Sequence, residues 1–235
     1  MAYVHLERIF LRRNLLMKIM IIGATGMAGS AVTAEAARRG HEVTAIARSQ
    51  QHLAQLQNEF PTIHVLAKDA FDLTTDDLAG AQVIVDAFAA GPSEAGQHVD
   101  LAKKLVKMYA DTTTPRLFFI LGAGSLKTGD DKHLFVDDIA QDPKSDAFIA
   151  IPKAQLEELH YLQGVKDVNW VGVSPSADFH KGVETDYTTG TDELLVSPDG
   201  HSVTTSGTMG VAILNEIEKP QHHQARFTVA DRDQD

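Results

Sequence analysis

The sequence predicts an α/β protein built on a doubly wound parallel sheet with a small C-terminal cap. Three observations lead to this prediction. Short apolar runs alternate with stretches of helical periodicity, which is the pattern of a parallel sheet covered by helices on both faces. A glycine-rich turn lies between the first apolar run and the first helical stretch. The chain has 235 residues, which is enough for one large domain with a full hydrophobic core.

The expected elements follow in order along the chain. A strand at 18–22 runs into the glycine turn, and the first helix, 28–39, ends at Gly40, a residue type that favours the left-handed conformation of a C′ position. The polar stretch 127–145 is expected to be a loop near the site. Further strands are expected at 41–47, 63–66, 82–87, 116–121 and 168–173, and further helices at 51–59, at 75–79, after a cap at Ser93, and at 147–163.

The two ends of the chain differ from this regular alternation. Residues 174–235 are expected to border a substrate pocket, with strands near 194–196 and 226–229 and a helix at 207–218. Ligands of open α/β sheets bind at the carboxyl ends of the strands, so this segment would cover those ends. Residues 1–16 lack the continuous apolar core and cleavage site of a signal peptide. They are expected to be a disordered extension or a mis-called start before a single domain at 17–235.

The composition excludes several classes of function. The 21 basic residues are outnumbered by 32 acidic residues, and the net charge of −11 argues against a surface for nucleic acid or anionic membranes. The absence of cysteine rules out disulfides, thiolate catalysis and iron–sulfur clusters, and it fits a cytoplasmic protein. No apolar run is long enough to span a bilayer. Histidines and acidic residues do not occur at metal-binding spacings, so no metal is predicted.

The segment KIMIIGATGMAG, residues 18–29, has the pattern of a dinucleotide-binding turn. Gly23 would allow the tight turn, Gly26 would let the backbone approach a pyrophosphate, and Gly29 would let helix and strand pack closely. The free N–H groups and the positive end of the following helix would face the phosphates. The pattern therefore predicts a Rossmann-like fold with these cofactor-binding residues: Gly23, Ala24, Thr25, Gly26, Met27, Ala28 and Gly29.

The end of the second strand indicates which nicotinamide cofactor is preferred. An acidic residue there would bind the ribose hydroxyls, whereas an arginine pairs with a 2′-phosphate. Arg48 stands nineteen residues after Gly29, followed by Ser49, so NADP(H) is favoured over NAD(H). Asp69 is either a contact to the adenine amino group or an ordinary turn residue. Phe88, Ala89 and Ala90 follow the fourth strand and are expected to form a wall of mostly small residues along the cofactor.

The chain lacks the usual acid of a short-chain dehydrogenase. Such enzymes reduce carbonyls with a Tyr-x-x-x-Lys pair, in which the tyrosine protonates the developing alkoxide. None of the four tyrosines here has a lysine four residues later. Lys153 is present in the expected helix, but Ile149 stands where the tyrosine would be. The lysine could hold the nicotinamide ribose. Chemistry without a tyrosine acid, such as hydride transfer to a flavin, is therefore favoured.

Several motifs resemble those of a known family. GATGMAG with Arg48, PKAQLEEL at 152–159, NWVGVSPSADF at 169–179 and LNEIEKPQHHQARFTV at 214–229 look like the atypical short-chain dehydrogenases. The chain resembles most their NAD(P)H-flavin reductase-like group, which is related to NmrA-like proteins and similar to mammalian biliverdin reductase B. The resemblance implies a Rossmann fold, a nicotinamide cofactor and a flavin- or quinone-like hydride acceptor, with the flavin as substrate.

The same resemblance implies positions for further residues. Ser174, Pro175 and Ser176 would lie beside the nicotinamide, with Ser176 reaching the substrate pocket. Gly122, Ala123, Gly124 and Ser125 would border the acceptor. The family often has Ser-Tyr-x-Asp-x-Ala at the start of the last helix, whereas this chain has TTSGTMG at 204–210, without the aromatic and acidic residues.

Alternative functions remain open at this point. Ser125 is a candidate to polarise a carbonyl substrate, with Lys153 as its catalytic companion, or it is a loop serine that caps a turn. The chain could instead be a non-enzymatic redox sensor that binds NADP(H) and reports to a protein partner. A sugar epimerase or dehydratase is a third reading, although such enzymes usually need the tyrosine. In each case a small-molecule ligand and a monomer or homodimer are expected.

Overall fold

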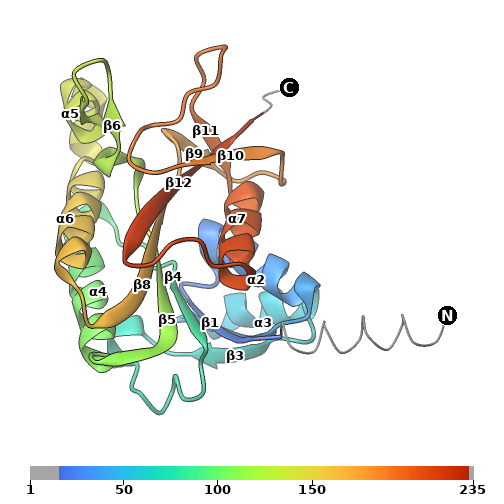
Figure 1. Ribbon diagram of the computed structural model, residues 1–235. Coiled ribbons are helices and arrows are strands. Elements are labelled where there is room, and N and C mark those ends of the chain that lie inside the picture. The colour runs from blue at the N-terminus through green and yellow to red at the C-terminus, as the bar shows by residue number, and fades with distance from the viewer. Residues whose placement is uncertain (1–15, 233–235) are drawn as a thin grey trace.

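An eight-stranded sheet forms the centre of the protein, and its strand order is β10-β12-β8-β5-β4-β1-β2-β3 (Figure 1). The structure is a computed structural model that describes residues 16–232. Neighbouring strands are parallel except β10 and β12, which are antiparallel. The strands are β1 (Lys18–Ile22), β2 (Glu42–Ala47), β3 (His64–Ala67), β4 (Val83–Asp86), β5 (Thr112–Ile120), β8 (Val168–Ser174), β10 (Tyr187–Gly190) and β12 (Ala225–Asp231).

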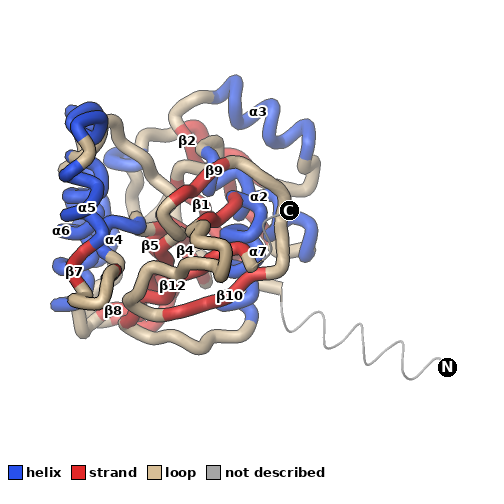
Figure 2. The backbone as a smooth tube through the Cα atoms, turned by 90° about the horizontal axis from the view of Figure 1, so that it is seen from above, coloured by secondary structure: helices blue, strands red, loops and turns tan. Residues whose placement is uncertain are grey.

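Helices cover both faces of the sheet, as the alternation of strands and helices predicts (Figure 2). One face carries α2 (Met27–Arg39), α3 (Gln50–Glu59) and α7 (Ser206–Glu218), and the other carries α4 (Gln97–Met108) and α6 (Ala150–Gly164). Five shorter elements complete the fold: α5 (Phe135–Gln141), β6 (Lys127–Thr128), β7 (His133–Leu134), β9 (Asp178–His180) and β11 (Val203–Thr205). The doubly wound α/β prediction is confirmed.

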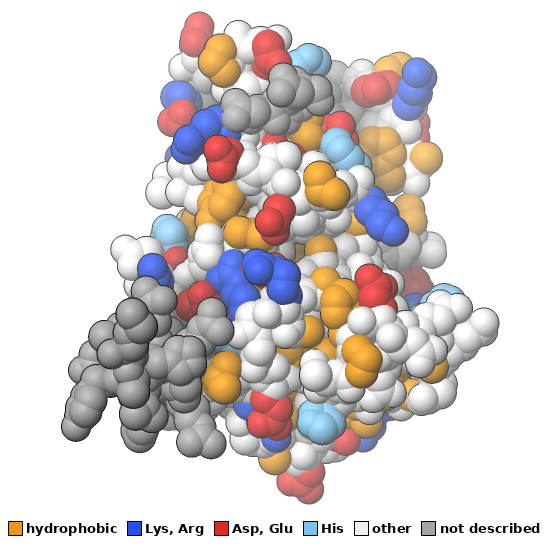
Figure 3. Space-filling view, turned by 90° about the vertical axis from the view of Figure 1, so that its right-hand side faces the viewer, with side chains coloured by type: hydrophobic (Ala, Val, Ile, Leu, Met, Phe, Trp, Pro, Cys, Tyr) orange, Lys and Arg blue, Asp and Glu red, His pale blue; other side chains and the backbone are white. Residues whose placement is uncertain are grey.

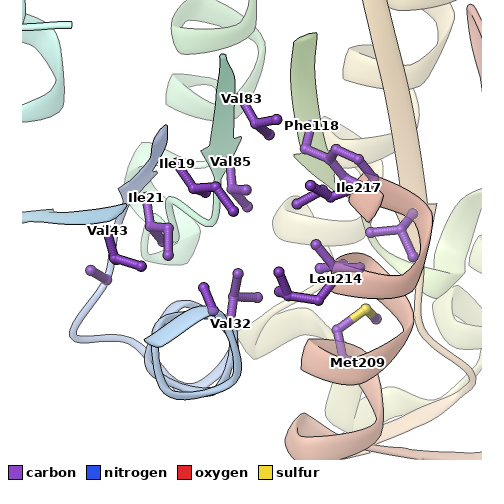
Figure 4. Close-up of a cluster of buried hydrophobic side chains, with 14 of the residues drawn as sticks. Ile19, Ile21, Val32, Val43, Val83, Val85, Phe118, Met209, Leu214 and Ile217 are labelled. Carbon is purple, nitrogen blue, oxygen red and sulfur yellow. The ribbon is translucent and has the colours of Figure 1, made fainter. Parts of the chain in front are cut away.

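The apolar runs of the strands are unbroken because both faces of the sheet are buried. Side chains alternate across a strand, so Ile19 and Ile21 of β1 pack under α2 and α7, whereas Met20 and Ile22 pack under α4 and α6. Figure 4 shows the first of these cores, where Val32 of α2 meets side chains from β1, β4 and α7. The two cores hold the sheet rigid, which fixes the positions of the loops at its carboxyl edge.

Helices α2 and α7 are also tied together at the surface of their shared face. Arg39 donates to Glu35 at 2.6 Å and to Glu218 at 2.8 Å, and Arg38 pairs with Glu35 as well. Figure 3 shows this side of the molecule, where basic and acidic side chains lie next to one another rather than in one basic field. A Cβ on Gly210 of α7 would lie 3.0 Å from the carbonyl oxygen of Ala31, so the two helices approach closely at this glycine.

Two helix predictions before the middle of the chain are wrong. Residues 75–79 form turns, because Asp77 accepts hydrogen bonds from both the N–H and the hydroxyl of Thr74 and from Lys68, and such local bonds compete with a helix. Ser93 does not cap α4. It lies in a short 3₁₀ helix, Pro92–Glu94, that begins at the proline, and α4 starts after Gly96.

The later irregular regions contain more structure than their sequence predicts. The expected loop at 127–145 holds the β6–β7 hairpin and α5, and residues 194–196 are not a strand. Strands β9, β10 and β11 were not predicted. Each is three or four residues long and pairs with a segment distant in sequence, as β9 does with β11, so local periodicity could not reveal them.

The predictions for the termini have different outcomes. Helix α7 and strand β12 lie where a helix at 207–218 and a strand at 226–229 are expected. Gly40 ends α2 with φ of 86°, in the left-handed conformation expected of it. The prediction for residues 1–16 falls, apart from Leu16, outside the described residues. Within 16–232, no helix combines the length and the apolar character that crossing a membrane requires.

Candidate functional site

Two connected cavities lie at the carboxyl edge of the sheet. One, of about 340 Å³, borders the ends of β1, β2 and β3, and the other, of about 470 Å³, extends toward β5, α6 and the segment after β8. They meet at the crossover between β1 and β4, where the strand order reverses, and this is where ligands bind in open α/β sheets. The residues that line both cavities are Gly26, Ala87, Phe88 and Ala89.

The glycine turn is shaped by contacts that exclude larger residues. Gly23 has φ of +76°, and a Cβ there would lie 2.4 Å from the carbonyl oxygen of Ala87. A Cβ on Gly29 would lie 2.2 Å from the carbonyl oxygen of Gly23, so α2 packs against the turn only because this residue is glycine. Gly26 lines both cavities, and Ala24 is fully buried behind the turn.

The start of α2 offers hydrogen-bond donors to the groove. Within residues 16–232, the backbone N–H groups of Thr25, Met27 and Ala28 have no acceptor. All three residues line a cavity, Thr25 in the smaller one and Met27 and Ala28 in the larger one. Free N–H groups at a helix N-terminus, beside glycines that leave room for a ligand, fit the pyrophosphate of a dinucleotide.

The smaller cavity brings together the residues expected at the adenosine end. Arg48 is exposed and has no ion pair within the described chain. Ser49 uses its hydroxyl to accept from the N–H of His52 and so caps α3. Asp69 accepts from the N–H of Phe71 at 2.9 Å, so it shapes the turn and also lines the cavity. Lys68 lines it too, but is paired with Asp77 at 2.7 Å.

The larger cavity is almost entirely apolar. Four phenylalanines line it: Phe88, Phe135, Phe148 and Phe179. Of its 23 lining residues only His98, Gln155 and Ser176 carry a side-chain nitrogen or oxygen, and none carries a charge at pH 7 when the histidine is neutral. The residues expected from sequence that line it are Gly26, Met27, Ala28, Phe88, Ala89, Ala90, Gly122, Ala123, Gly124, Pro175 and Ser176.

Three residues expected at the nicotinamide or the acceptor line neither cavity. Ser125 is buried and its hydroxyl donates to the carbonyl oxygen of Gly122 at 3.2 Å. Ser174 is also fully buried beneath the loop that follows β8. Lys153 is exposed on the surface of α6, because the cavity side of that helix is occupied by Pro152 and Gln155. None of the three contacts the space in which an acceptor would bind.

Sequence reasoning missed Arg226, which holds the two buried serines. One of its nitrogens donates to the hydroxyls of Ser125 and Ser174, each at 3.1 Å, and another pairs with Asp192 at 2.7 Å. The arginine therefore connects β12 to the loop after β5 and to the last residue of β8, and the segments that follow these strands line the cavity. A basic residue inside an otherwise apolar strand, as in ARFTV, is the signal that could have revealed it.

Buried titratable groups lie behind the larger cavity. Asp86, at the end of β4, accepts from the N–H of Phe88 at 3.0 Å, and burial raises the pKa of its carboxyl to about 7. Burial, and then the charge of Asp86, raises the pKa of Glu158 well above its usual range, and one oxygen of Glu158 has no partner in the described chain. Burial lowers the pKa of His98. Within 16–232, no three His, Cys, Asp or Glu side chains are placed to hold a metal ion.

The departure from the family pattern at 204–210 has a structural explanation. A Cβ on Gly207 would lie 2.4 Å from the backbone nitrogen of Glu184, so the chain that precedes β10 lies directly against the start of α7. Thr205 caps α7 by accepting from the N–H of Thr208, and its hydroxyl also donates to Val183. The threonines and glycine of this segment therefore anchor the C-terminal cap.

The fold and the groove together define a nucleotide-binding Rossmann protein. Its family is also clear, because the model of the NAD(P)H-binding family matches residues 23–231. The chain belongs to this NAD(P)H-binding family, whose nicotinamide cofactor fits the glycine turn described above.

Individual relatives agree with this membership. The uncharacterized protein YwnB of Bacillus subtilis (strain 168) is 35% identical over 215 residues, which are 91% of this chain and 98% of YwnB. A solved Lactobacillus casei protein is 38% identical with a TM-score of 0.86, covering 92% of this chain and 100% of its own. SP1627 of Streptococcus pneumoniae TIGR4, provisionally named an NADH-flavin reductase, is 31% identical with a TM-score of 0.81 and the same coverage. The resemblance drawn from the sequence motifs is confirmed, and the family is oxidoreductase-like.

Proposed function

We propose that this protein is an NADPH-dependent reductase that transfers a hydride to a flavin or quinone-like acceptor. The observation that carries the proposal is the larger cavity. It continues directly from the dinucleotide groove, it is lined by four phenylalanines, and it contains no tyrosine or lysine. A flat aromatic acceptor matches such walls, because aromatic rings pack favourably against one another in stacked or edge-on arrangements.

The residues of the groove would hold the cofactor across the sheet edge. The N–H groups at the start of α2 would bind the pyrophosphate, and the wall formed by Phe88, Ala89 and Ala90 would lie along the nicotinamide half. When bound there, the nicotinamide supplies a hydride at the junction with the acceptor cavity. The reduced acceptor can take its proton from solvent, so the protein need not provide an acid.

The protein would contribute mainly by positioning and by excluding water. Met27 and Phe148 line the cavity while remaining 39% and 45% exposed, so apolar side chains form part of its rim. Holding two flat rings together in a water-poor space can supply much of the rate enhancement for such a transfer. Ser125 and Lys153 have no part in this mechanism, because neither reaches the cavity.

The proposed preference for NADPH rests on Arg48. Arg48 lines the smaller cavity, is exposed and has no carboxylate partner within 16–232, and it precedes Ser49, the N-cap of α3. A 2′-phosphate there would gain both the arginine and the positive end of that helix. No acidic side chain stands at this position to bind the ribose hydroxyls of NADH instead.

The test is to mix purified protein with NADPH and follow its oxidation with FMN, FAD, riboflavin or menadione, and then to repeat the series with NADH. Saturable, acceptor-dependent oxidation that prefers NADPH is the expected result. Tight NADPH binding without acceleration by any acceptor would replace the reductase by a redox sensor, which needs only cofactor binding. If neither nucleotide binds, the proposal fails at the glycine turn.

A further inference from the structure

The larger cavity contains only two polar side chains that are free to bind an acceptor. The hydroxyl of Ser176, the third polar group, donates to the carbonyl oxygen of Val229 at 3.2 Å and is fully buried. His98 comes from the first turn of α4 and Gln155 from α6, and these helices are neighbours on the same face of the sheet (Figure 1). In an apolar pocket a few such polar groups decide orientation and specificity.

The hydrogen bond to Ala90 determines which nitrogen of His98 carries its proton. The backbone N–H of Ala90 can only donate, and it lies 3.4 Å from Nε2 of the imidazole. Nε2 must therefore accept, which leaves the proton of the neutral ring on Nδ1. Burial lowers the pKa of His98, so the ring is neutral at pH 7. The Phe88 ring, edge-on at 5.6 Å, holds the imidazole in this orientation.

The Nδ1 atom of His98 is not committed to another group of the described protein. It makes no hydrogen bond in the described chain, and it is not one of the fully enclosed polar atoms there that lack a partner. His98 is only 5% exposed and lines the cavity, so a ligand in that cavity is the group that can approach its imidazole. An N–H donor held in an apolar pocket is a strong recognition element, because an acceptor that cannot use it leaves it unpaired.

Gln155 lies across the same space and lacks an internal partner. Its carboxamide makes no hydrogen bond within residues 16–232, and it lies close to Gly122, where an added Cβ would be 2.1 Å from Oε1. The glycine therefore makes room for the glutamine. A carboxamide can both donate and accept, so it can pair with the C=O and the N–H of one heterocycle edge.

We propose that His98 and Gln155 bind the carbonyl-bearing edge of the acceptor, His98 by donating from Nδ1 and Gln155 by pairing through its carboxamide. This inference rests on the proposed reductase function, and it names the chemistry the acceptor needs: a flat ring system with a carbonyl or imide on one edge. Flavins and quinones share that edge. His98 and Gln155 are acceptor-binding residues that leave the bound nucleotide untouched.

Paired substitutions separate this role from a structural one. In His98→Gln the amide can replace Nε2 and keep the bond to Ala90, but the Nδ1 donor is lost. In His98→Asn the amide nitrogen can occupy the position that Nδ1 has in the wild type, so a donor remains while the bond to Ala90 is lost. Gln155→Leu keeps the volume and removes the polar group. The matched controls are His160→Gln and Gln163→Leu, which change exposed residues of α6 outside both cavities.

Two quantities are measured for each variant. One is the Kd of riboflavin for the protein saturated with NADP⁺, and the other is KM and kcat for riboflavin and menadione at saturating NADPH. We expect the riboflavin Kd and both KM values to rise about tenfold in His98→Gln and Gln155→Leu, the loss of one buried hydrogen bond. The NADPH Kd should stay within about twofold, His98→Asn should retain most of the acceptor affinity, and both controls should match the wild type.

Other outcomes overturn the inference. If His98→Gln and Gln155→Leu bind riboflavin as the wild type does, neither side chain recognises the acceptor. If His98→Asn is impaired and His98→Gln is not, the histidine only supports the backbone at Ala90. If the wild-type protein binds NADPH but neither binds nor reduces these acceptors, the proposed reductase function is wrong. That outcome differs from one in which the wild type reduces the acceptors and only the roles of His98 and Gln155 are wrong.

Discussion

The two halves of the site are built in different ways. The nucleotide half, which is the smaller cavity together with the glycine turn, is formed by residues between Ile22 and Ala89. Its shape depends mainly on the backbone: a positive φ, two glycines without room for a Cβ, and free N–H groups. The other half, the larger cavity that we propose as the acceptor half, is assembled from side chains of segments as distant as Met27 and Phe179. Backbone shape is fixed by the fold, whereas the side chains of a cavity wall can change without altering the fold.

This difference suggests how the protein acquires its specificity. A shared glycine turn is compatible with many acceptors, because it contacts only the part of the cofactor that is common to all of them. The acceptor cavity is where relatives of the same fold can diverge. Four predictions test this comparison, from the largest expected effect to the smallest.

Gly29→Ala should have the largest effect, because it disturbs the backbone packing that shapes the nucleotide half. The added Cβ would lie 2.2 Å from the carbonyl oxygen of Gly23, and overpacking of this kind costs about 3 kcal/mol. Thermal unfolding should shift down by about 10 °C, together with a loss of NADPH binding. Gly91→Ala is the control, since nothing lies within 4 Å of its Cβ position. Equal Tm values for the two variants would contradict the packing argument.

Arg48→Ala tests the side chain that we assign to the 2′-phosphate. Loss of a charge-assisted contact should weaken NADPH binding roughly 30- to 100-fold and leave NADH binding nearly unchanged. Isothermal titration with both nucleotides measures the two affinities. Arg48→Lys should fall between the wild type and the alanine variant, because lysine keeps the charge but not the bidentate geometry. An equal loss of affinity for NADPH and NADH would show that Arg48 does not bind the 2′-phosphate.

Asp86→Asn tests the buried group behind the junction of the two halves. The pKa of Asp86 is raised to about 7 in the folded protein, against 3.8 for an ordinary aspartate. Between about pH 4 and 7 the carboxyl is ionised in the unfolded state but still protonated in the folded state. The free energy of unfolding therefore falls as pH rises through that window. The asparagine variant keeps the oxygen that accepts from Phe88 and has no such slope.

The two proteins should have similar Tm values near pH 4. At pH 8 the variant should be more stable, by about 2 kcal/mol or about 5 °C. Differential scanning calorimetry at one-unit steps of pH provides the comparison. The pKa of Glu158 is also raised, so both proteins will keep some dependence of stability on pH. A constant difference in Tm across pH 4 to 8 would mean that Asp86 is ionised throughout.

Phe148→Ala should have the smallest effect, confined to the acceptor half. Phe148 lines the cavity rim and is 45% exposed, so it contributes one aromatic contact worth about 1 kcal/mol. KM for riboflavin should rise about fivefold while the NADPH Kd and Tm stay close to wild type. Val183→Ala, at a residue 79% exposed and outside both cavities, is the matched control. An unchanged KM would remove Phe148 from the acceptor site.

Local pattern predicted much of the fold, and it failed where partners are distant. The β1 strand and α2 were predictable because their apolar spacing and their glycines act within a few residues. Strand β10 was not predictable, since its four residues are held by an antiparallel pairing with β12, which is separated from it by β11 and α7 in the sequence. The same limit explains Ser125, which motif resemblance placed at the acceptor but which Arg226 holds inside the protein.

The sequence by itself determined the doubly wound fold, the glycine turn after the first strand and the absence of a Tyr-x-x-x-Lys motif, because each depends on residue types at short spacings. The tertiary structure alone decided which side chains meet in the larger cavity. His98 and Gln155 lie 57 positions apart in the chain (155 − 98) and share no motif, yet α4 and α6 bring them to one space. Only the packing of these two helices on one face of the sheet brings His98 and Gln155 into the lining of one cavity.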